Sequence, residues 1–164
     1  MAVTPANVSA GASPFESGLV RKTLVGWFLS GVLSSFLGAI LPVWRYHLTE
    51  DFLIVGHFFL AMNVGILAAV PLWRYVLPKR NLSLVLSCGC GIACVSLLFL
   101  AELSPVTLFW WRMAGIAGIG FGNGLLNLAL FQALTPVYRM NPSASLSLSG
   151  TFFGLGCAVT ALLV

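Results

Sequence analysis

Apolar residues gather into five long runs along this chain, and short polar segments separate the runs. A membrane-spanning helix needs about 20 mostly apolar residues, and each run is close to that length. The pattern therefore predicts an all-α protein, a polytopic transmembrane bundle of about five membrane-spanning helices. The predicted spans are residues 24–44, 52–73, 82–101, 108–134 and 143–164.

The composition agrees with a membrane protein. Of the 164 residues, 59% are hydrophobic and 7% are charged, whereas about 25% of the residues of an ordinary soluble domain are charged. So few charges cannot cover the surface of a water-soluble globule, and we expect a lipid bilayer around the chain. Residues 1–20 are polar and small, which predicts a flexible N-terminal tail before a transmembrane bundle over residues 21–164.

Basic residues lie singly or in small clusters beside the apolar runs, although the net charge is +4. This placement indicates membrane topology rather than a nucleic-acid surface, because Lys and Arg are enriched in cytoplasmic connectors. In alternating connectors six basic residues share the side of the N-terminus and two share the other side. We therefore expect a cytoplasmic N-terminus and a multi-pass protein of the cell membrane. The six are Arg21, Lys22, Arg74, Lys79, Arg80 and Arg139, and the two are Arg45 and Arg112.

The fifth apolar run continues to Val164 without a polar or aromatic flank. Membrane spans usually have such flanking residues, which anchor the helix end at the interface. We therefore expect this chain to be the N-terminal portion of a longer protein, and the C-terminal portion to be its partner in the membrane.

Glycine is abundant in the fourth run. Small residues let membrane helices approach closely, and residues four apart lie on one helix face. Gly118 with Gly122, and Gly120 with Gly124, therefore predict two helix-packing faces. The same reasoning predicts packing surfaces in the first and fifth runs, at Gly31, Ser34, Ser35 and Gly38 and at Gly150 and Gly154.

Arg112 lies just inside the fourth run, after Trp110 and Trp111. A cation in the middle of a membrane helix costs roughly 3 kcal/mol to insert, unless it reaches the interface or pairs. One interpretation is an arginine that extends to the interface beside its aromatic neighbours. The other is a buried cation that meets an anionic substrate or a carboxylate in a central cavity. The sequence leaves both open.

Three asparagines lie within apolar runs. Asn123 and Asn127 are four apart and therefore share a helix face, and Asn63 lies at a comparable depth in the second run. One interpretation is hydrogen bonding between helices, worth about 0.6 kcal/mol on average. The other is a polar line along a solute pathway. The two interpretations are compatible.

Enzymatic signatures are missing from the sequence. His47 and His57 lie near the outer interface, and neither an HExxH nor a GxSxG element occurs. Cys88, Cys90 and Cys94 lie in an apolar run without a nearby His or carboxylate, and their spacing is not CxxC, which favours packing over a metal site. We expect no catalytic residues, no bound metal and no cofactor.

The connector between the second and third runs is short and basic. It ends in Lys79 and Arg80, which match the closing pair of the motif G-x-x-x-D-R/K-x-G-R/K-R/K. That motif lies in the second connector of major facilitator superfamily transporters, which this chain therefore resembles. Pro71, Tyr75 and Pro78 replace the first glycine, the aspartate and the second glycine of the motif.

Arg112 is followed six residues later by Gly118, and this spacing is similar to the fourth-span motif of the same family. Residues 20–164 thus resemble the first five spans of a major facilitator superfamily transporter. The resemblance implies two six-helix halves with a midplane solute site between them. It implies that the first, second, fourth and fifth spans line that site, and that Arg112 has a role in proton coupling.

The resemblance leads us to expect a transporter that moves a small solute by alternating access, of which this chain is part of the N-terminal half. The competing hypothesis is a small non-transporting membrane protein that acts as an accessory or assembly subunit.

Overall fold

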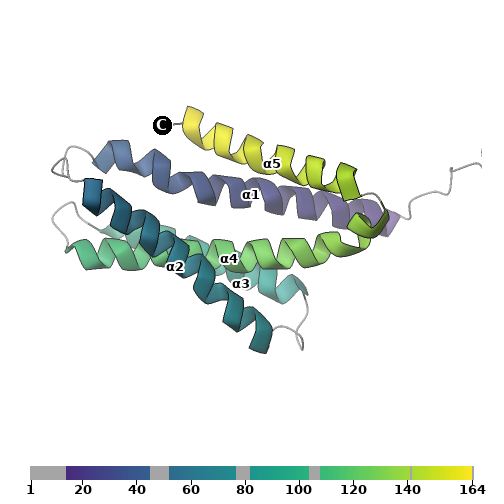
Figure 1. Cartoon of the computed structure of the whole chain (residues 1–164), viewed down its shortest axis with the longest axis horizontal. Coiled ribbons are helices and arrows are strands. Elements are labelled where there is room, and N and C mark those ends of the chain that lie inside the picture. The colour runs from purple at the N-terminus through teal and green to yellow at the C-terminus, as the bar shows by residue number, and fades with distance from the viewer. Residues whose placement is uncertain (1–13, 45–51, 77–81, 104–107, 141, 164) are drawn as a thin grey trace, which may run out of the picture.

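The computed structural model describes residues 14–44, 52–76, 82–103, 108–140 and 142–163, and this part of the chain forms five α-helices (Figure 1). Each helix is long and apolar enough to cross a membrane. The prediction of an all-α bundle of membrane-spanning helices is therefore confirmed. The helices are α1 (Pro14–Trp44), α2 (Phe52–Val76), α3 (Leu82–Glu102), α4 (Phe109–Met140) and α5 (Pro142–Leu162).

Helix α1 begins earlier than the sequence predicts. Its first residue is Pro14, so residues 14–20 of the predicted tail are helical. Proline is favoured in the first turn of a helix, because the amide hydrogen that it lacks would have no partner there. The apolar stretch of α1 covers Arg21–Pro42, close to the predicted start of the transmembrane bundle. The remainder of the predicted tail, residues 1–13, lies outside the described residues.

Successive helices run in alternating directions (Figure 1). The starts of α1, α3 and α5 and the ends of α2 and α4 therefore face the same side of the bundle. We call this the basic side, because Arg21 and Lys22 near the start of α1, Arg74 near the end of α2 and Arg139 near the end of α4 belong to it. The predicted cytoplasmic N-terminus would place the basic side at the cytoplasmic face.

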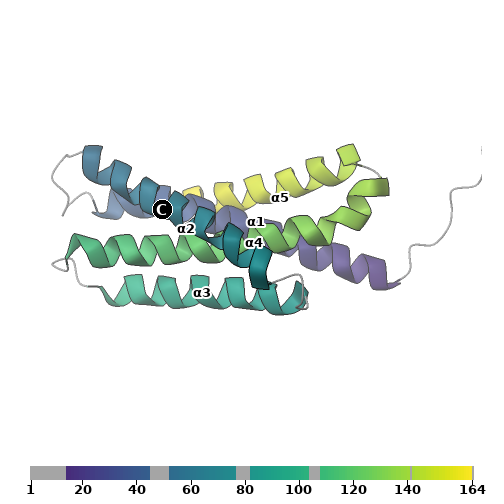
Figure 2. The same cartoon turned by 60° about the horizontal axis from the view of Figure 1, so that its bottom comes forward.

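Helix α4 is the centre of the bundle. Of its apolar stretch 61% is buried, against 22–33% for the other four helices. Helices α2 and α3 pack mainly on α4, and α1 contacts α4 while it pairs closely with α5. Figure 2 shows α3 on the outer side of α4, apart from α1 and α5. The other four helices are thus arranged around α4.

Alternate glycines of α4 admit two different neighbours. A Cβ atom at Gly118 or Gly122 would overlap α3, whereas a Cβ atom at Gly120 or Gly124 would overlap α2. The absence of side chains therefore lets both helices approach the backbone of α4. These contacts agree with the two faces expected from the four-residue spacing. The contacted residues are Ser96, Gly89 and Ala93 on α3 and Met62, Ile66 and Ala69 on α2.

Helices α1 and α5 approach each other in the same way. A Cβ atom at Gly31 would overlap the α5 backbone at Phe153, and a Cβ atom at Gly156 would overlap the α1 backbone at Phe28. The thiol of Cys157 donates a hydrogen bond to the Gly31 carbonyl oxygen across this interface, with a sulfur–oxygen distance of 3.3 Å. Gly31 therefore packs as expected, and Gly156 is a contact that the sequence analysis missed.

Three further glycines do not pack as expected. No atom of another described helix lies within 4 Å of a Cβ atom built at Gly38, Gly150 or Gly154. The four-residue spacing defines a face but does not show whether another helix covers that face. The packing surface expected on α1 does not contact a single helix. Ser34 forms a hydrogen bond with α4, whereas Ser35 forms one within its own helix.

The outer surface of the bundle is apolar. Large aliphatic side chains such as Leu60, Leu67, Val95, Leu98 and Leu155 are more than half exposed. Exposed apolar surface of this extent is stable only in contact with lipid or with other apolar helices. The five helices therefore belong to a multi-pass integral membrane protein in contact with the bilayer.

Candidate functional site

The most deeply buried polar side chains described between two helices lie where α1 meets α4. Asn123 of α4 is fully buried, and its side-chain nitrogen donates to Ser34 Oγ at 2.9 Å. Ser30 Oγ lies 2.9 Å from Asn123 Oδ1 and 2.6 Å from Asn127 Oδ1. We call Ser30, Ser34, Asn123 and Asn127 the amide–hydroxyl cluster.

The contacts of the cluster limit which of its atoms can donate a hydrogen bond and which must accept one. The Ser30 hydroxyl has one proton, so it cannot donate to both Asn123 Oδ1 and Asn127 Oδ1 in full. The oxygen and nitrogen of an asparagine amide are interchangeable in shape. With the Asn127 amide reversed, its nitrogen donates to Ser30 Oγ, and Ser30 donates to Asn123 Oδ1. Each of the three close contacts then has one donor and one acceptor.

Helical spacing explains why these four side chains meet. Ser30 and Ser34 are four residues apart on α1, and Asn123 and Asn127 are four apart on α4, so each pair shares one helix face. The two helices run in opposite directions (Figure 1), which places Ser34 beside Asn123 and Ser30 beside Asn127. Ser30 was missed in the sequence analysis, although its spacing from Ser34 is the same signal.

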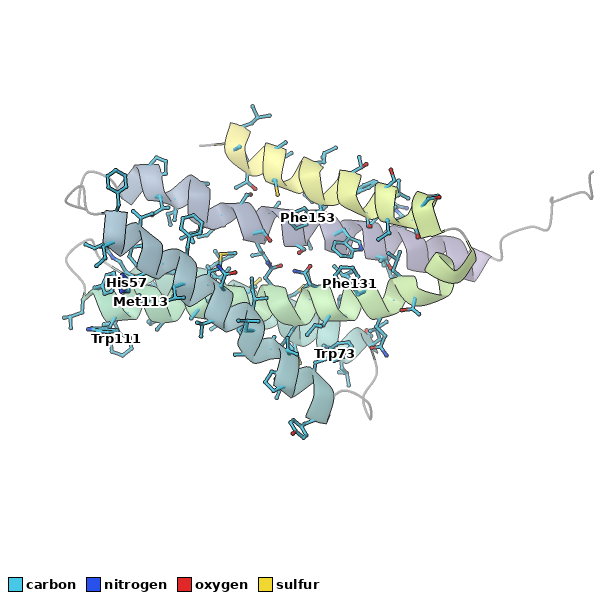
Figure 3. All side chains as sticks on the ribbon, viewed as in Figure 1. His57, Trp73, Trp111, Met113, Phe131 and Phe153 are labelled. Atoms are coloured by element: carbon cyan, nitrogen blue, oxygen red, sulfur yellow. The ribbon has the colours of Figure 1, made fainter. Side chains whose placement is uncertain are left out.

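Arg112 is buried inside the bundle, with 7% of its surface exposed. Its neighbours Trp110 and Trp111 are 70% and 56% exposed, so the aromatic rings face outward while the guanidinium faces inward. Trp111 lies at the end of α4 that is far from Phe131 and Trp73 (Figure 3). An arginine that extends along the surface to the interface would be exposed. The burial disagrees with an arginine that extends along the surface, and a cation that meets an anionic substrate or a carboxylate in a central cavity stays a prediction.

Arg112 and the amide–hydroxyl cluster lie on one face of α4 but at different depths. Asn123 follows Arg112 by eleven residues, which is close to three full turns and about 16 Å along the axis. Ile116 and Ile119 lie between them on this face, and each is 2% exposed. These isoleucines pack with Leu37 of α1 and Phe58 of α2. An apolar layer therefore separates the two polar sites.

Asn63 does not join the polar residues of α4. It lies on the exposed surface of α2, and its side-chain nitrogen donates to the Phe59 carbonyl oxygen of the same helix at 2.8 Å. Asn63 is therefore not part of the polar contact between α1 and α4. Asn123 and Asn127 form hydrogen bonds between helices, as the first interpretation expects, and a polar line along a solute pathway stays a prediction.

Other candidate residues lie apart from this site or outside the description. Lys79 and Arg80 of the basic connector are among the residues that the structure does not describe. Cys90 and Cys157 are half-buried at helix contacts, whereas Cys88 and Cys94 are exposed. Among the described residues no three His, Cys, Asp or Glu side chains come together as a metal site would require.

Comparison with known proteins does not identify this chain. No protein-family model matches the sequence, and no curated protein or solved structure is significantly similar to it. The functional argument therefore rests on the buried polar groups and on the arrangement of the five helices.

Proposed function

We propose that this chain is part of the N-terminal half of a membrane transporter that moves a small solute by alternating access. The observation that carries the proposal is the single face of α4 on which Arg112 and the Asn123 amide are buried and the Asn127 amide is partly buried. Charged and polar groups within membrane helices are costly and typically belong to solute or ion pathways. The α2–α4 contacts at Gly120 and Gly124 are made by backbone atoms and a methyl group, so close helix packing does not by itself require such groups.

The positions of the helices support this proposal. The resemblance to the major facilitator superfamily implies a solute site lined by the first, second, fourth and fifth spans. In the described bundle α3 packs mainly on the outer side of α4 (Figure 2). The opposite side of the bundle is then formed by the other four helices, α1, α2, α4 and α5. A second six-helix half would face that side, and the solute would bind between the halves.

The two polar sites on α4 suit different tasks in such a cycle. The positive charge of Arg112 would attract an anionic solute or respond to a coupled proton. The Asn127 amide is only partly buried and would offer a donor and an acceptor to the solute. The apolar layer at Ile116 and Ile119 would keep the two sites apart in one conformation. Rocking of one half against the other would open it.

Reconstitution tests the proposal. Full-length protein in proteoliposomes would be incubated with isotope-labelled organic anions, amino acids and sugars, with protein-free liposomes as the blank. We expect one class of solute to accumulate with time, and collapse of an imposed proton gradient to lower the accumulation. If folded protein accumulated none of the three classes, this proposal would be wrong for them all.

Substitutions at Arg112 test its role in the same assay. Arg112→Gln removes the charge and should lower uptake at least tenfold, whereas Arg112→Lys should retain part of it. Asn63→Leu is a suitable control, because Asn63 is exposed and bonds within its own helix. Normal uptake by well-expressed Arg112→Gln protein would leave Arg112 with an anchoring role.

The five-span chain by itself should not transport, because alternating access needs two halves that move against each other. The measurement is solute uptake by liposomes that contain only residues 1–164. Uptake at the rate of the longer protein would overturn the two-half mechanism.

An accessory or assembly subunit is the second candidate. The observation that favours it is the face of α5 at Gly150 and Gly154, which no described helix covers. Such a face suits a helix of a different membrane protein. The encoding DNA separates the candidates: an in-frame continuation with further spans after Val164 favours the transporter, and a stop codon favours the subunit.

A further inference from the structure

A groove opens to the surface between α1, α3 and α4 on the basic side of the bundle. Its volume is about 540 Å³, and its walls are almost entirely apolar. It lies on the side of α4 that α3 occupies, away from the side assigned to the solute. The lining residues are Arg21, Lys22, Val25, Gly26, Leu29, Leu86, Cys90 and Leu126.

Charge is concentrated at one end of this groove. Arg21 and Lys22 are adjacent at the start of the apolar stretch of α1, and both are exposed. Neither forms an ion pair with another described residue. Further along α1 the walls contain Val25 and Leu29, about 6 and 12 Å from Arg21 along the helix axis. The groove therefore has a cationic mouth where the apolar stretch of α1 begins and an apolar interior further along that stretch.

We propose that this groove binds an anionic phospholipid. The headgroup phosphate would contact Arg21 and Lys22, and one acyl chain would lie along Val25, Leu29 and Leu86. Basic pockets between membrane helices on the cytoplasmic side are known to bind anionic headgroups, and the predicted topology places this mouth on that side. The inference does not depend on transport, because the groove and the amide–hydroxyl cluster are separate.

The walls explain why a lipid fits better than a polar solute. Beyond Arg21 and Lys22 the lining side chains are aliphatic apart from the thiol of Cys90, so the interior offers little to hydrogen-bond a polar solute. The groove is also lined by Leu126 of α4, which packs with Trp27 and Leu130 in a buried cluster. An acyl chain needs only apolar contact, which this surface provides.

Native mass spectrometry of delipidated full-length protein tests the proposal. The probes are dioleoylphosphatidylglycerol, dioleoylphosphatidylcholine with the same acyl chains, and glycerol 3-phosphate as the headgroup without chains. We expect one phosphatidylglycerol to bind at least tenfold more tightly than phosphatidylcholine. Glycerol 3-phosphate should not saturate the site at the same concentration. Equal binding of the two lipids, or tight binding of glycerol 3-phosphate alone, would overturn the proposal.

Matched variants assign the lipid to this groove. Arg21→Gln with Lys22→Gln should weaken phosphatidylglycerol binding about thirtyfold, since each basic residue near the surface contributes appreciably to anionic-lipid attraction. Lys79→Gln with Arg80→Gln removes the same charge from the segment between α2 and α3 and should change binding less than threefold. Equal losses in the two double variants would show general attraction to the membrane and refute a specific site.

A second pair of variants tests the apolar part. Val25→Trp fills the groove while both charges remain, and it should weaken phosphatidylglycerol binding at least tenfold. Leu67→Trp places the same side chain on the exposed surface of α2 and should leave binding unchanged. Thermal unfolding confirms that each variant is folded. Undiminished binding by folded Val25→Trp protein would show that the acyl chain does not enter the groove.

Discussion

Helix α4 packs against α2 and against α1 by opposite means. Against α2 it presents Gly120 and Gly124, and the contacts are with backbone atoms and a methyl group. Against α1 it presents Asn123 and Asn127, and the contacts are hydrogen bonds to serine hydroxyls. The α2–α4 interface depends on the absence of side chains at two glycines, whereas the α1–α4 interface depends on specific hydrogen-bonding atoms.

This difference determines how each interface fails. An added methyl group at a glycine contact overlaps a backbone that cannot turn aside, so the helices must separate. A lost amide at the α1 interface leaves hydroxyls that find other partners, since membrane hydrogen bonds contribute only about 0.6 kcal/mol on average. The glycine interface should therefore dominate stability, whereas the polar interface should determine how α1 is aligned with α4.

Gly120→Ala should produce the largest effect. The new Cβ atom would overlap the Met62 backbone, and overpacking costs about 1–3 kcal/mol or more. Gly154→Ala is the matched control, because no other described helix lies near it and alanine is the better helix former by about 1 kcal/mol. Unfolding in mixed detergent micelles measures both free energies. Equal stability of the two variants would contradict the described α2–α4 contact.

Asn123→Leu should have the next largest effect. The change preserves bulk but removes two hydrogen bonds to α1, so we expect a loss of about 1–2 kcal/mol in unfolding free energy. Asn63→Leu should cost less than about 0.5 kcal/mol because that side chain is exposed on the surface of the described bundle. The same unfolding titration compares the two variants. A larger loss for Asn63→Leu would show that Asn63, and not Asn123, stabilises the bundle.

A smaller effect is expected for the coupling between Ser30 and Asn127. The single variants Ser30→Ala and Asn127→Leu and the double variant form a cycle, whose interaction energy should be about 0.6 kcal/mol. A coupling energy of zero within error would mean that the 2.6 Å contact contributes nothing to stability.

The smallest effect is expected at the contact between α5 and α1. Cys157→Ala removes a thiol that donates to the Gly31 carbonyl oxygen. Such weak hydrogen bonds contribute about 0.5 kcal/mol, so the unfolding free energy should change by no more than that. A loss as large as that of Gly120→Ala would show that α5 contributes far more to the bundle than its limited burial indicates.

The sequence predicted the helices better than their contacts. Runs of apolar residues located all five spans, because length and hydrophobicity suffice for that purpose. The boundary at Pro14 was missed, since a polar, proline-containing segment is compatible with a tail and with a helix start. Spacing also showed that Asn123 and Asn127 share a face.

Neighbours could not be predicted in the same way. Gly120 and Gly154 occur in the same four-residue pattern, yet only the first is covered by another described helix. Asn63 and Asn123 are equally polar and similarly deep, yet one is exposed and the other buried. Which helix lies beside which is decided by the packing of all five together, and one chain's pattern contains little information on that.

The central place of α4 has a consequence for the order in which the protein is made. Helices α1, α2 and α3 leave the ribosome first, and they barely contact one another. Until α4 arrives, Ser30 and Ser34 lack their amide partners and Gly65 of α2 lacks the backbone of Ala117. The nascent three-helix stage is therefore a set of loosely associated spans, and synthesis of α4 is the event that assembles the bundle. A ribosome stalled before Phe109 would leave a product open to membrane quality-control proteases.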